Sequence, residues 1–372
     1  MKKTNGQQII SLFEQWAPKA LAVEGDPIGL QIGTLNKPVS KVLVTLDVNQ
    51  KIVDEAIEQQ CELIIAHHPP IFRNLKNMRT DLPHGSLIEK LIKHDIAVYA
   101  AHTNLDIAEG GVNDLLVNCL QLENVEILEK TTAENLMKLA VFTPKDSTNR
   151  VRSSLANAGA GKIGEYTNCS FTSEGEGRFR PSENATPYIG EASKLTIVDE
   201  EKVEVVFPVT FKNRILKALF SAHPYEEPAY DLFKMNIEVN EKGLGRVGTL
   251  ANSITLHEYA QIVKKQLQVP FVRVVGDLDR KVQKVAVLGG DGNKYIQSAK
   301  RAGADVFITG DLYFHTAQDA EAINLAVIDP GHHIEQIMKV GVADYMTAAC
   351  TESKLSVEFI PSKLSTEPFQ LI

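Results

Sequence analysis

The stretch Leu63-Ile64-Ile65-Ala66-His67-His68-Pro69-Pro70 decides how we interpret the fold of this chain. Four consecutive apolar residues bounded by turn-forming residues are typical of a strand buried on both faces, although a buried helix segment has the same pattern. The two prolines end the strand, because proline donates no hydrogen bond to a sheet. Ligands of open α/β sheets bind just beyond the carboxyl ends of the strands. Two histidines at such an end are either metal ligands or a polar cap.

Strands and helices alternate on both sides of this stretch. Apolar runs predict strands at 42–46 and 96–100, and apolar residues at helical spacing predict helices at 52–60 and 87–92. Strands that alternate with helices in this way form right-handed βαβ crossovers and a parallel sheet. The first part of the chain is therefore predicted to have an α/β fold.

A second α/β stretch begins near residue 250 and resembles the first. Lys41–His68 aligns without gaps on Lys284–Asp311, and further along Asp106 aligns on Glu335. The identical residues are few, and common βαβ patterning would explain them equally well. Polar residues nevertheless recur at equivalent strand ends. We therefore predict two pseudo-symmetric βαβ half-domains, 1–130 and 246–372, that face one metal-binding cleft.

The pattern between the halves, at 131–245, is different. It predicts the succession β-α-β-β-α-β, with strands at 136–142, 166–171, 203–207 and 230–237 and helices at 148–158 and 212–221. This succession is the split-βαβ, ferredoxin-like arrangement, and we interpret the segment as an inserted α+β domain. Its long connection at 173–194 is rich in Gly, Ser and Glu and is predicted to be mobile. His223-Pro224-Tyr225-Glu226-Glu227 is a possible metal motif in the insert, but a structured turn is the favoured interpretation.

Composition argues against several classes of protein. The 39 Lys and Arg against 47 Asp and Glu give a net charge of −8, and no long basic run suggests a nucleic-acid or anionic-membrane surface. The four cysteines are scattered without a C-x-x-C pair, so neither a disulfide framework nor a thiolate zinc site is expected. No apolar run approaches membrane-spanning length. We expect a cytoplasmic protein that binds neither nucleic acid nor membrane.

Five histidine and acidic residues are predicted to converge at the strand ends. His67 and His68 point to opposite faces of a regular strand, so they suit two ions side by side, or one ion where the strand breaks. Asp106 adds a carboxylate that could bridge two ions. His332 and Glu335 lie three residues apart, on one face of the helix that begins there. Five nitrogen and oxygen ligands without cysteine suit a pair of divalent ions, as in hydrolytic two-metal sites.

The ligand set also bears on the identity of the ion and on the substrate. Nitrogen and oxygen ligands accept zinc, iron or manganese, whereas a structural zinc site usually contains thiolates. Two divalent ions against two carboxylates would leave the site positive, which suits a small anionic substrate such as a nucleotide. His333 is surplus to this set. Weaker candidates near strand ends, with supporting roles favoured, are His102, Asp47, Asp311 and His315.

Several motifs resemble one known family over nearly the whole chain. They are Ala66-His67-His68-Pro69, Thr103-Asn104-Leu105-Asp106, Asp329-Pro330-Gly331-His332, Gly29-Leu30-Gln31-Ile32-Gly33 and Gly243-Leu244-Gly245-Arg246-Val247-Gly248. As a set they resemble the dinuclear metal-centre proteins called GTP cyclohydrolase 1 type 2 homologues.

The resemblance implies metal ligation by four of the residues above and by a glutamate of the last helix. Those four are His67, His68, Asp106 and His332. Some family members place the glutamate four residues after the histidine, but position 336 here is glutamine, so Glu335 takes the role. The insert resembles the PII/CutA-like domain of longer members. Such members are toroidal hexamers, so the resemblance implies a homohexamer.

Two functions fit these observations. The first is a dinuclear metal-dependent hydrolase of a nucleotide or another phosphorylated small molecule; for a cyclohydrolase the attacked atom would be purine C8. The second is a metal-binding regulator or scaffold whose inserted domain senses a small ligand. The sequence shows no obvious general acid beside the ligands, which keeps the second function open.

Overall fold

The computed structural model describes residues 4–370, which form two compact units. Unit 1 combines the chain up to Thr132 with the chain from Lys242 onward, and unit 2 is the segment Ala133–Glu241. Both boundaries fall inside long strands, β5 (Glu123–Pro144) and β8 (Tyr230–Thr255). Unit 1 therefore contains two halves of the chain that are separated in sequence by all of unit 2.

The first half of unit 1 builds a five-stranded sheet. Its elements are α1 (Gly6–Trp16), η1 (Lys19–Leu21), β1 (Gly29–Ile32), β2 (Lys41–Thr45), α2 (Gln50–Glu58), β3 (Leu63–Ala66), α3 (Pro83–Lys93), β4 (Ala97–Ala100), α4 (Thr103–Ile107) and α5 (Val112–Leu120). The strand order is β1-β4-β3-β2-β13, and β13 (Glu358–Pro361) comes from the C-terminal end of the chain. Strand β1 is antiparallel to β4, and the other neighbours are parallel.

The second half builds a similar sheet with β8 at one side. Its elements are α8 (Leu256–Gln266), β9 (Arg273–Val275), β10 (Lys281–Asp291), η3 (Asn293–Tyr295), α9 (Ile296–Arg301), β11 (Val306–Gly310), α10 (Phe314–Ala322), β12 (Ala326–Asp329), η4 (His332–Ile337) and α11 (Met338–Glu352). The strand order in this half is β8-β10-β11-β12-β9. Even α11, with 15 residues, is too short to span a bilayer, and no helix within residues 4–370 is long and apolar enough to do so.

The two sheets share strand order and register. The order β1-β4-β3-β2 in the first corresponds to β9-β12-β11-β10 in the second. Val42 pairs with Leu63, and Val285 pairs with Val306, which are the residues that the sequence alignment places together. The sheets differ at the fifth strand, because β13 is parallel to β2 whereas β8 is antiparallel to β10. The predicted pseudo-symmetry is confirmed for four strands of each half.

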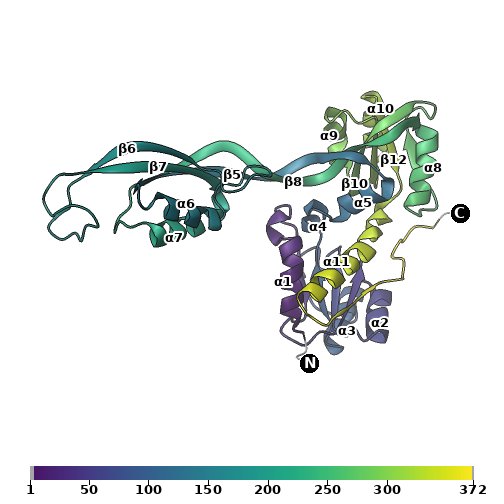
Figure 1. Cartoon of the computed structure of the whole chain (residues 1–372). Helices are drawn as coiled ribbons and strands as arrows, with labels where there is room; N and C mark the ends of the chain where they lie inside the picture. The colour runs from purple at the N-terminus through teal and green to yellow at the C-terminus, as the bar shows by residue number, and fades with distance from the viewer. Residues whose placement is uncertain (1–3, 371–372) are drawn as a thin grey trace. The chain divides into compact units, whose positions relative to one another are not determined.

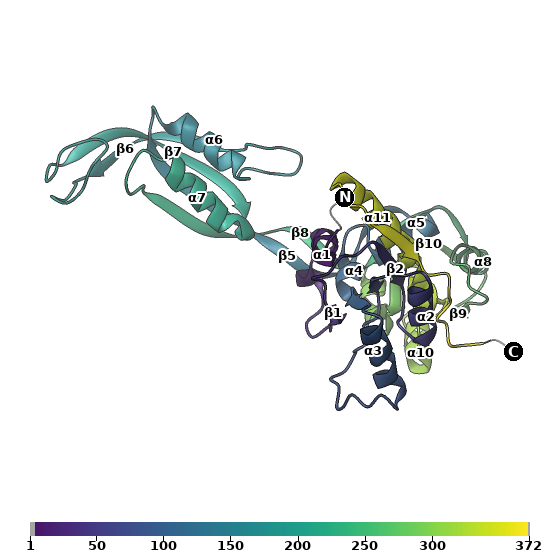
Figure 2. The same cartoon turned by 90° about the horizontal axis from the view of Figure 1, so that it is seen from below.

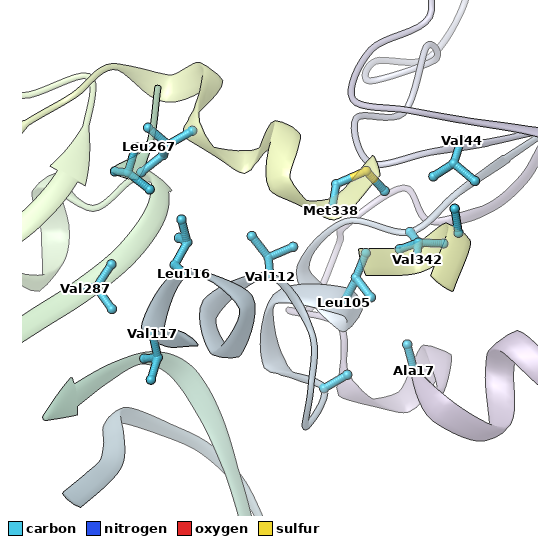
Figure 3. Packing of buried hydrophobic residues seen from close by; sticks show 14 of the residues in the cluster. Ala17, Val44, Leu105, Val112, Leu116, Val117, Leu267, Val287, Met338 and Val342 are labelled. Carbon is cyan, nitrogen blue, oxygen red and sulfur yellow. The ribbon is translucent and has the colours of Figure 1, made fainter. Parts of the chain in front are cut away.

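Successive side chains of the central strands enter different cores. In β2, Val42 and Val44 enter a core that both halves share, and Leu43 enters an outer core with α2 and α3. Because both faces are buried, these strands appear in the sequence as continuous apolar runs. Helix α11 lies between the two sheets of unit 1 (Figure 1) and contributes Met338 and Val342 to the shared core (Figure 3). The shared core holds the strand ends of both halves in place.

Unit 2 has the element succession β5-α6-β6-β7-α7-β8. Its further elements are α6 (Thr148–Asn157), β6 (Phe171–Phe179), β7 (Thr196–Pro208), η2 (Val209–Phe211) and α7 (Lys212–Ala222). The strand order is β6-β7-β5-β8, as in a split-βαβ fold. Helices α6 and α7 cover one face of this sheet (Figure 2), and Val151 and Leu219 pack there against Val203 and Phe207 of β7.

Strand β6 lies later in the chain than the predicted strand at 166–171. Asn168 has a φ of 59° and Gly164 a φ of 55°, so the segment around Tyr166 is a turn rather than extended backbone. Strand β6 instead begins at Phe171 and pairs with β7. This pairing takes up the first part of the connection predicted at 173–194, and the segment that joins β6 to β7 is 180–195.

Candidate metal centre

The structure brings all five predicted ligand residues together in unit 1. His67 and His68 directly follow β3, and His332 and Glu335 lie in η4, directly after β12. Asp106 was predicted to end a strand; it lies in the short helix α4, which follows β4. All of these positions follow the carboxyl ends of parallel strands, which is where α/β sheets place their ligands.

The ligand atoms form two groups that share one carboxylate. The candidate atoms of His67, Asp106 and Glu335 lie within 4.8 Å of one another, and so do those of His68, His332 and Glu335. Oε1 of Glu335 is 3.7 Å from Nε2 of His67, and its Oε2 is 3.0 Å from Nε2 of His68. Asp106 supplies a carboxylate that could bridge two ions by the sequence alone, and its atoms belong to the first of these groups. The carboxylate common to both groups is that of Glu335, which lies close to the imidazoles of His67, His68 and His332.

Hydrogen bonds at the outer ring nitrogens orient the histidines. Nδ1 of His67 donates to the Ala101 carbonyl oxygen at 2.8 Å, and Nδ1 of His68 lies 2.7 Å from Oδ1 of Asp47. Each bond occupies Nδ1 and leaves Nε2 facing the cluster. This is the usual arrangement of metal-binding histidines, whose second nitrogen donates to a carbonyl or carboxylate. Asp47 therefore has the supporting role that the sequence favoured.

Two further histidines are held in the same way. Nδ1 of His332 lies 2.8 Å from Oδ2 of Asp311, and Nδ1 of His102 lies 2.9 Å from Oδ1 of Asp26. A ring nitrogen of His102 also comes within 4.8 Å of those of His67 and His68. The sequence placed His102 among the weaker candidates and missed Asp26. The sequence does show an acidic residue in the turn just before Pro27. No local pattern, however, indicates that this residue contacts His102.

The remaining histidines near strand ends do not join the cluster. His333 lies outside the groups found among residues 4–370, although it neighbours His332 in sequence. His315 is exposed, and its Nδ1 lies 3.2 Å from Oε1 of Gln318. The structure therefore separates His333 and His315 from the five predicted ligands.

Unpartnered buried atoms show that the cluster fits a cation. His67 is fully buried and Asp106 is 6% exposed. Within residues 4–370, Nε2 of His67 and Oδ1 of Asp106 have no hydrogen-bond partner, and they face each other at 3.5 Å. Burying such an atom unsatisfied costs about 1–3 kcal/mol. In the second group, Nε2 of His68 and Nε2 of His332 are only 3.3 Å apart. A divalent cation in each group would give these atoms a partner, and imidazole and carboxylate donors suit zinc, iron or manganese.

The histidines and carboxylates of the cluster shift one another's pKa values. Burial opposes the charging of His68, but hydrogen bonds with Asp47 and Glu335 outweigh it and raise the pKa of His68 to about 10. Burial likewise opposes the charging of His332, while its contacts with Glu335 and Asp311 raise its pKa to about 9. Burial would raise the pKa of Glu335, yet the His67 charge and histidine hydrogen bonds hold it well below the usual value.

Raising the pH is expected to weaken the metal-free fold and to strengthen metal binding. The folded pKa values of His68 and His332 lie above the ordinary 6.5, so their protonation stabilises the fold below about pH 6.5. This contribution is lost as the pH rises towards 9–10. Metal ions compete with the same protons, so the apparent affinity should increase with pH. Calorimetry of chelated protein and Zn²⁺ competition titrations at several pH values measure both trends, and a pH-independent affinity would contradict this account.

Comparisons with known proteins agree with the motifs. The Duf34/NIF3 (NGG1p interacting factor 3) family matches residues 4–368. A Bacillus subtilis (strain 168) protein named GTP cyclohydrolase 1 type 2 homolog is 57% identical over 371 residues, which cover 100% of both chains. A Halalkalibacterium halodurans protein of the same name is 51% identical over 372 residues, again with 100% of both chains covered.

A solved structure agrees with the fold as well. The crystal structure of a Bacillus cereus protein related to NIF3 matches with a TM-score of 0.90 and 50% sequence identity, and the match covers 100% of both chains. Both the family match and this structural match include all five clustered residues. The chain therefore belongs to the Duf34/NIF3 family.

Proposed function

We propose that this protein is a metal-dependent hydrolase that holds two divalent ions and acts on a nucleotide or another phosphorylated small molecule. The observation that carries the proposal is the position of Glu335, whose two oxygens belong to two adjacent ligand groups. Each group supplies three nitrogen or oxygen donors and no thiolate, which is typical of hydrolytic rather than structural sites. The names of the relatives, which refer to GTP cyclohydrolase, support the same reaction class.

Charge and exposure indicate how a substrate would reach the site. Asp106 and Glu335 bring two negative charges, so two bound divalent ions would leave a local excess of positive charge in an acidic protein. When bound, such ions polarise a substrate oxygen and lower the pKa of water. The His67 side chain is fully buried, whereas those of His68 and His332 are 23% and 38% exposed. A substrate would therefore approach from the side of His68 and His332.

The neighbouring side chains keep the site in one geometry. Asp47 and Asp311 hold the rings of His68 and His332, so Nε2 of each ring remains directed at Glu335. Such preorganised contacts contribute to catalysis because they need not be rearranged as the reaction proceeds. The buried ring of His67 excludes water from the far side of the cluster.

Metal loading followed by a turnover screen tests the proposal. Protein reconstituted anaerobically with zinc, iron or manganese should contain close to two ions per chain and should hydrolyse a nucleotide, with GTP tested first, or a simple phosphoester. Chelated protein and an Asp311→Asn variant are the controls, and the variant should retain the fold with reduced turnover. Two bound ions without turnover of any nucleotide or phosphoester would contradict the hydrolase proposal while leaving the metal centre intact.

A further inference from the structure

Unit 2 contains a cavity that takes no part in the metal centre. Its volume is about 680 Å³, within the range of small-molecule sites. The end of β6 and the segment that follows it line one side, and the turn after α7 lines the other. All lining residues belong to unit 2, so unit 2 forms the cavity without residues from unit 1.

The turn after α7 is built to place Tyr225 at this cavity. Nε2 of His223 lies 3.0 Å from the Phe142 carbonyl oxygen, and Nδ1 of His223 accepts a hydrogen bond from the backbone N–H of Tyr225 at 3.1 Å. Both ring nitrogens are therefore occupied, and the favoured interpretation of this motif as a structured turn agrees with the geometry. The turn contributes Tyr225, Glu226 and Glu227 to the lining of the cavity.

Three of the aromatic residues that line the cavity have their rings close together. The ring of Tyr225 lies 5.7 Å from that of Phe179 and 6.3 Å from that of Tyr188, measured between centroids. Tyr188 is 54% exposed although it is a large aromatic residue. Aromatic faces attract cations through their ring quadrupole, and cages of such rings recognise ammonium groups.

A buried carboxylate lies at the same cavity. Glu200 of β7 is 7% exposed, and its Oε1 accepts a hydrogen bond from the Tyr225 hydroxyl at 2.9 Å. A Cβ added at Gly177 would lie 2.1 Å from Oε2 of Glu200, so the absence of a side chain there leaves room for the carboxylate. Within residues 4–370, Glu200 forms no ion pair with a basic side chain. Buried carboxylates normally have a positive partner, and this one lacks it.

The other charges of the lining favour a cation as well. The lining contains more carboxylates than guanidinium groups, namely Glu176, Glu200, Glu226 and Glu227 against Arg178 and Arg180. Arg178 is already paired with Glu176 at 2.6 Å. An anionic ligand would meet this excess of negative charge, whereas a cation would balance it.

We propose that this cavity binds a small organic cation, an amine or guanidinium compound. The positive group lies against the Glu200 carboxylate, and its carbon skeleton lies between the rings of Phe179, Tyr188 and Tyr225. The site is independent of the hydrolase proposal, because it shares no residue with the metal centre.

Agmatine, which carries an amine and a guanidinium group, is the first probe. Titration of the full-length, metal-loaded protein by calorimetry should show saturable binding at one site per chain. Glu200→Gln should weaken binding at least tenfold, and Tyr188→Ala at least threefold. Asp199→Asn is the matched control, because it removes one charge from an exposed side chain of the same strand and should change affinity less than twofold. Putrescine and choline extend the test to other amines, and citrate serves as the anionic comparison.

Three results would overturn the proposal. One is the absence of saturable binding for agmatine, putrescine and choline alike. Another is an effect of Glu200→Gln no larger than that of Asp199→Asn, and the third is tighter binding of citrate than of the cations. If thermal unfolding shows that Glu200→Gln does not fold, Tyr188→Ala decides the question, because its exposed ring is not needed for the core.

Discussion

Replacing Glu335 with alanine is expected to abolish the binding of both metal ions of the proposed dinuclear centre. The two oxygens of this carboxylate are the only ones that serve both ligand groups among the described residues. Without it, each of the two groups that contain Glu335 is left with two protein donors, too few for a catalytic metal site, which usually has three protein ligands. Elemental analysis of the purified variant should therefore find well under one ion per chain, against close to two in the parent protein.

Variants of the unshared ligands provide the comparison. Asp106→Ala and His332→Ala each remove a donor from one group only, so each should retain about one ion per chain. His315→Ala removes an exposed histidine outside the cluster and should leave the metal content unchanged. Circular dichroism shows whether each variant is folded. A folded Glu335→Ala protein that still carries two ions would contradict the shared position of this carboxylate.

Replacing Arg246 with leucine is expected to lower the free energy of unfolding by about 3 kcal/mol or more, as when one partner of a buried ion pair is removed. Arg246 is buried, and its Nε and Nη2 donate to the two carboxylate oxygens of Asp114 at 2.5 and 3.1 Å. Its Nη1 donates to the carbonyl oxygens of Gly243 and Gly245, both at 2.9 Å. Leucine would remove these four hydrogen bonds, although Oδ2 of Asp114 would keep the one that it accepts from the Gly110 N–H. Urea unfolding measures the loss.

Arg301→Leu is the control for this variant. Arg301 is exposed, and its ion pair with Glu129 is 3.9 Å long, so its removal should change stability by about 0.5 kcal/mol or less. Equal losses for the two variants would show that the buried Arg246 contacts contribute no more than surface ones.

The Arg246 contacts also explain the glycine motif that the sequence shared with the family. A Cβ at Gly243 would lie 2.1 Å from the Glu129 carbonyl oxygen of β5, and Gly245 has a φ of +64°. The glycines thus allow β8 to approach β5 closely and let its backbone turn around the guanidinium group. The sequence showed the motif, but only the structure shows that its role is packing.

The parts of the fold that the sequence predicted are those with a strong local signal. Strands such as β3 and β11 are apolar on both faces, and this pattern is local. Strand β13 has no such pattern, because only Phe359 of its four residues is buried. Its pairing with β2 depends on a contact between distant parts of the chain. Strand β6 was misplaced because turn geometry at Asn168 outweighed the apolar pattern beside it.

In the candidate site, too, the sequence predicted the features with a local signal and missed those that depend on contacts between distant residues. His67, His68 and His332 were predicted because each follows a strand or begins a helix, and that position is visible in the sequence. The shared position of Glu335 was not, because it depends on how η4 lies against the opposite half of unit 1. The hydrogen bond between His102 and Asp26 was likewise missed, since it joins residues that only the folded chain brings together.

Both of the ligand groups that contain Glu335 draw on both halves of unit 1. The chain before unit 2 supplies His67, His68 and Asp106, and the chain after it supplies His332 and Glu335. Neither half can therefore assemble either of these two groups by itself. A bound ion would act as a cross-link between two segments that are far apart in the sequence, much as a disulfide closes a long loop. The metal content of the protein would then indicate whether these two segments have come together during folding.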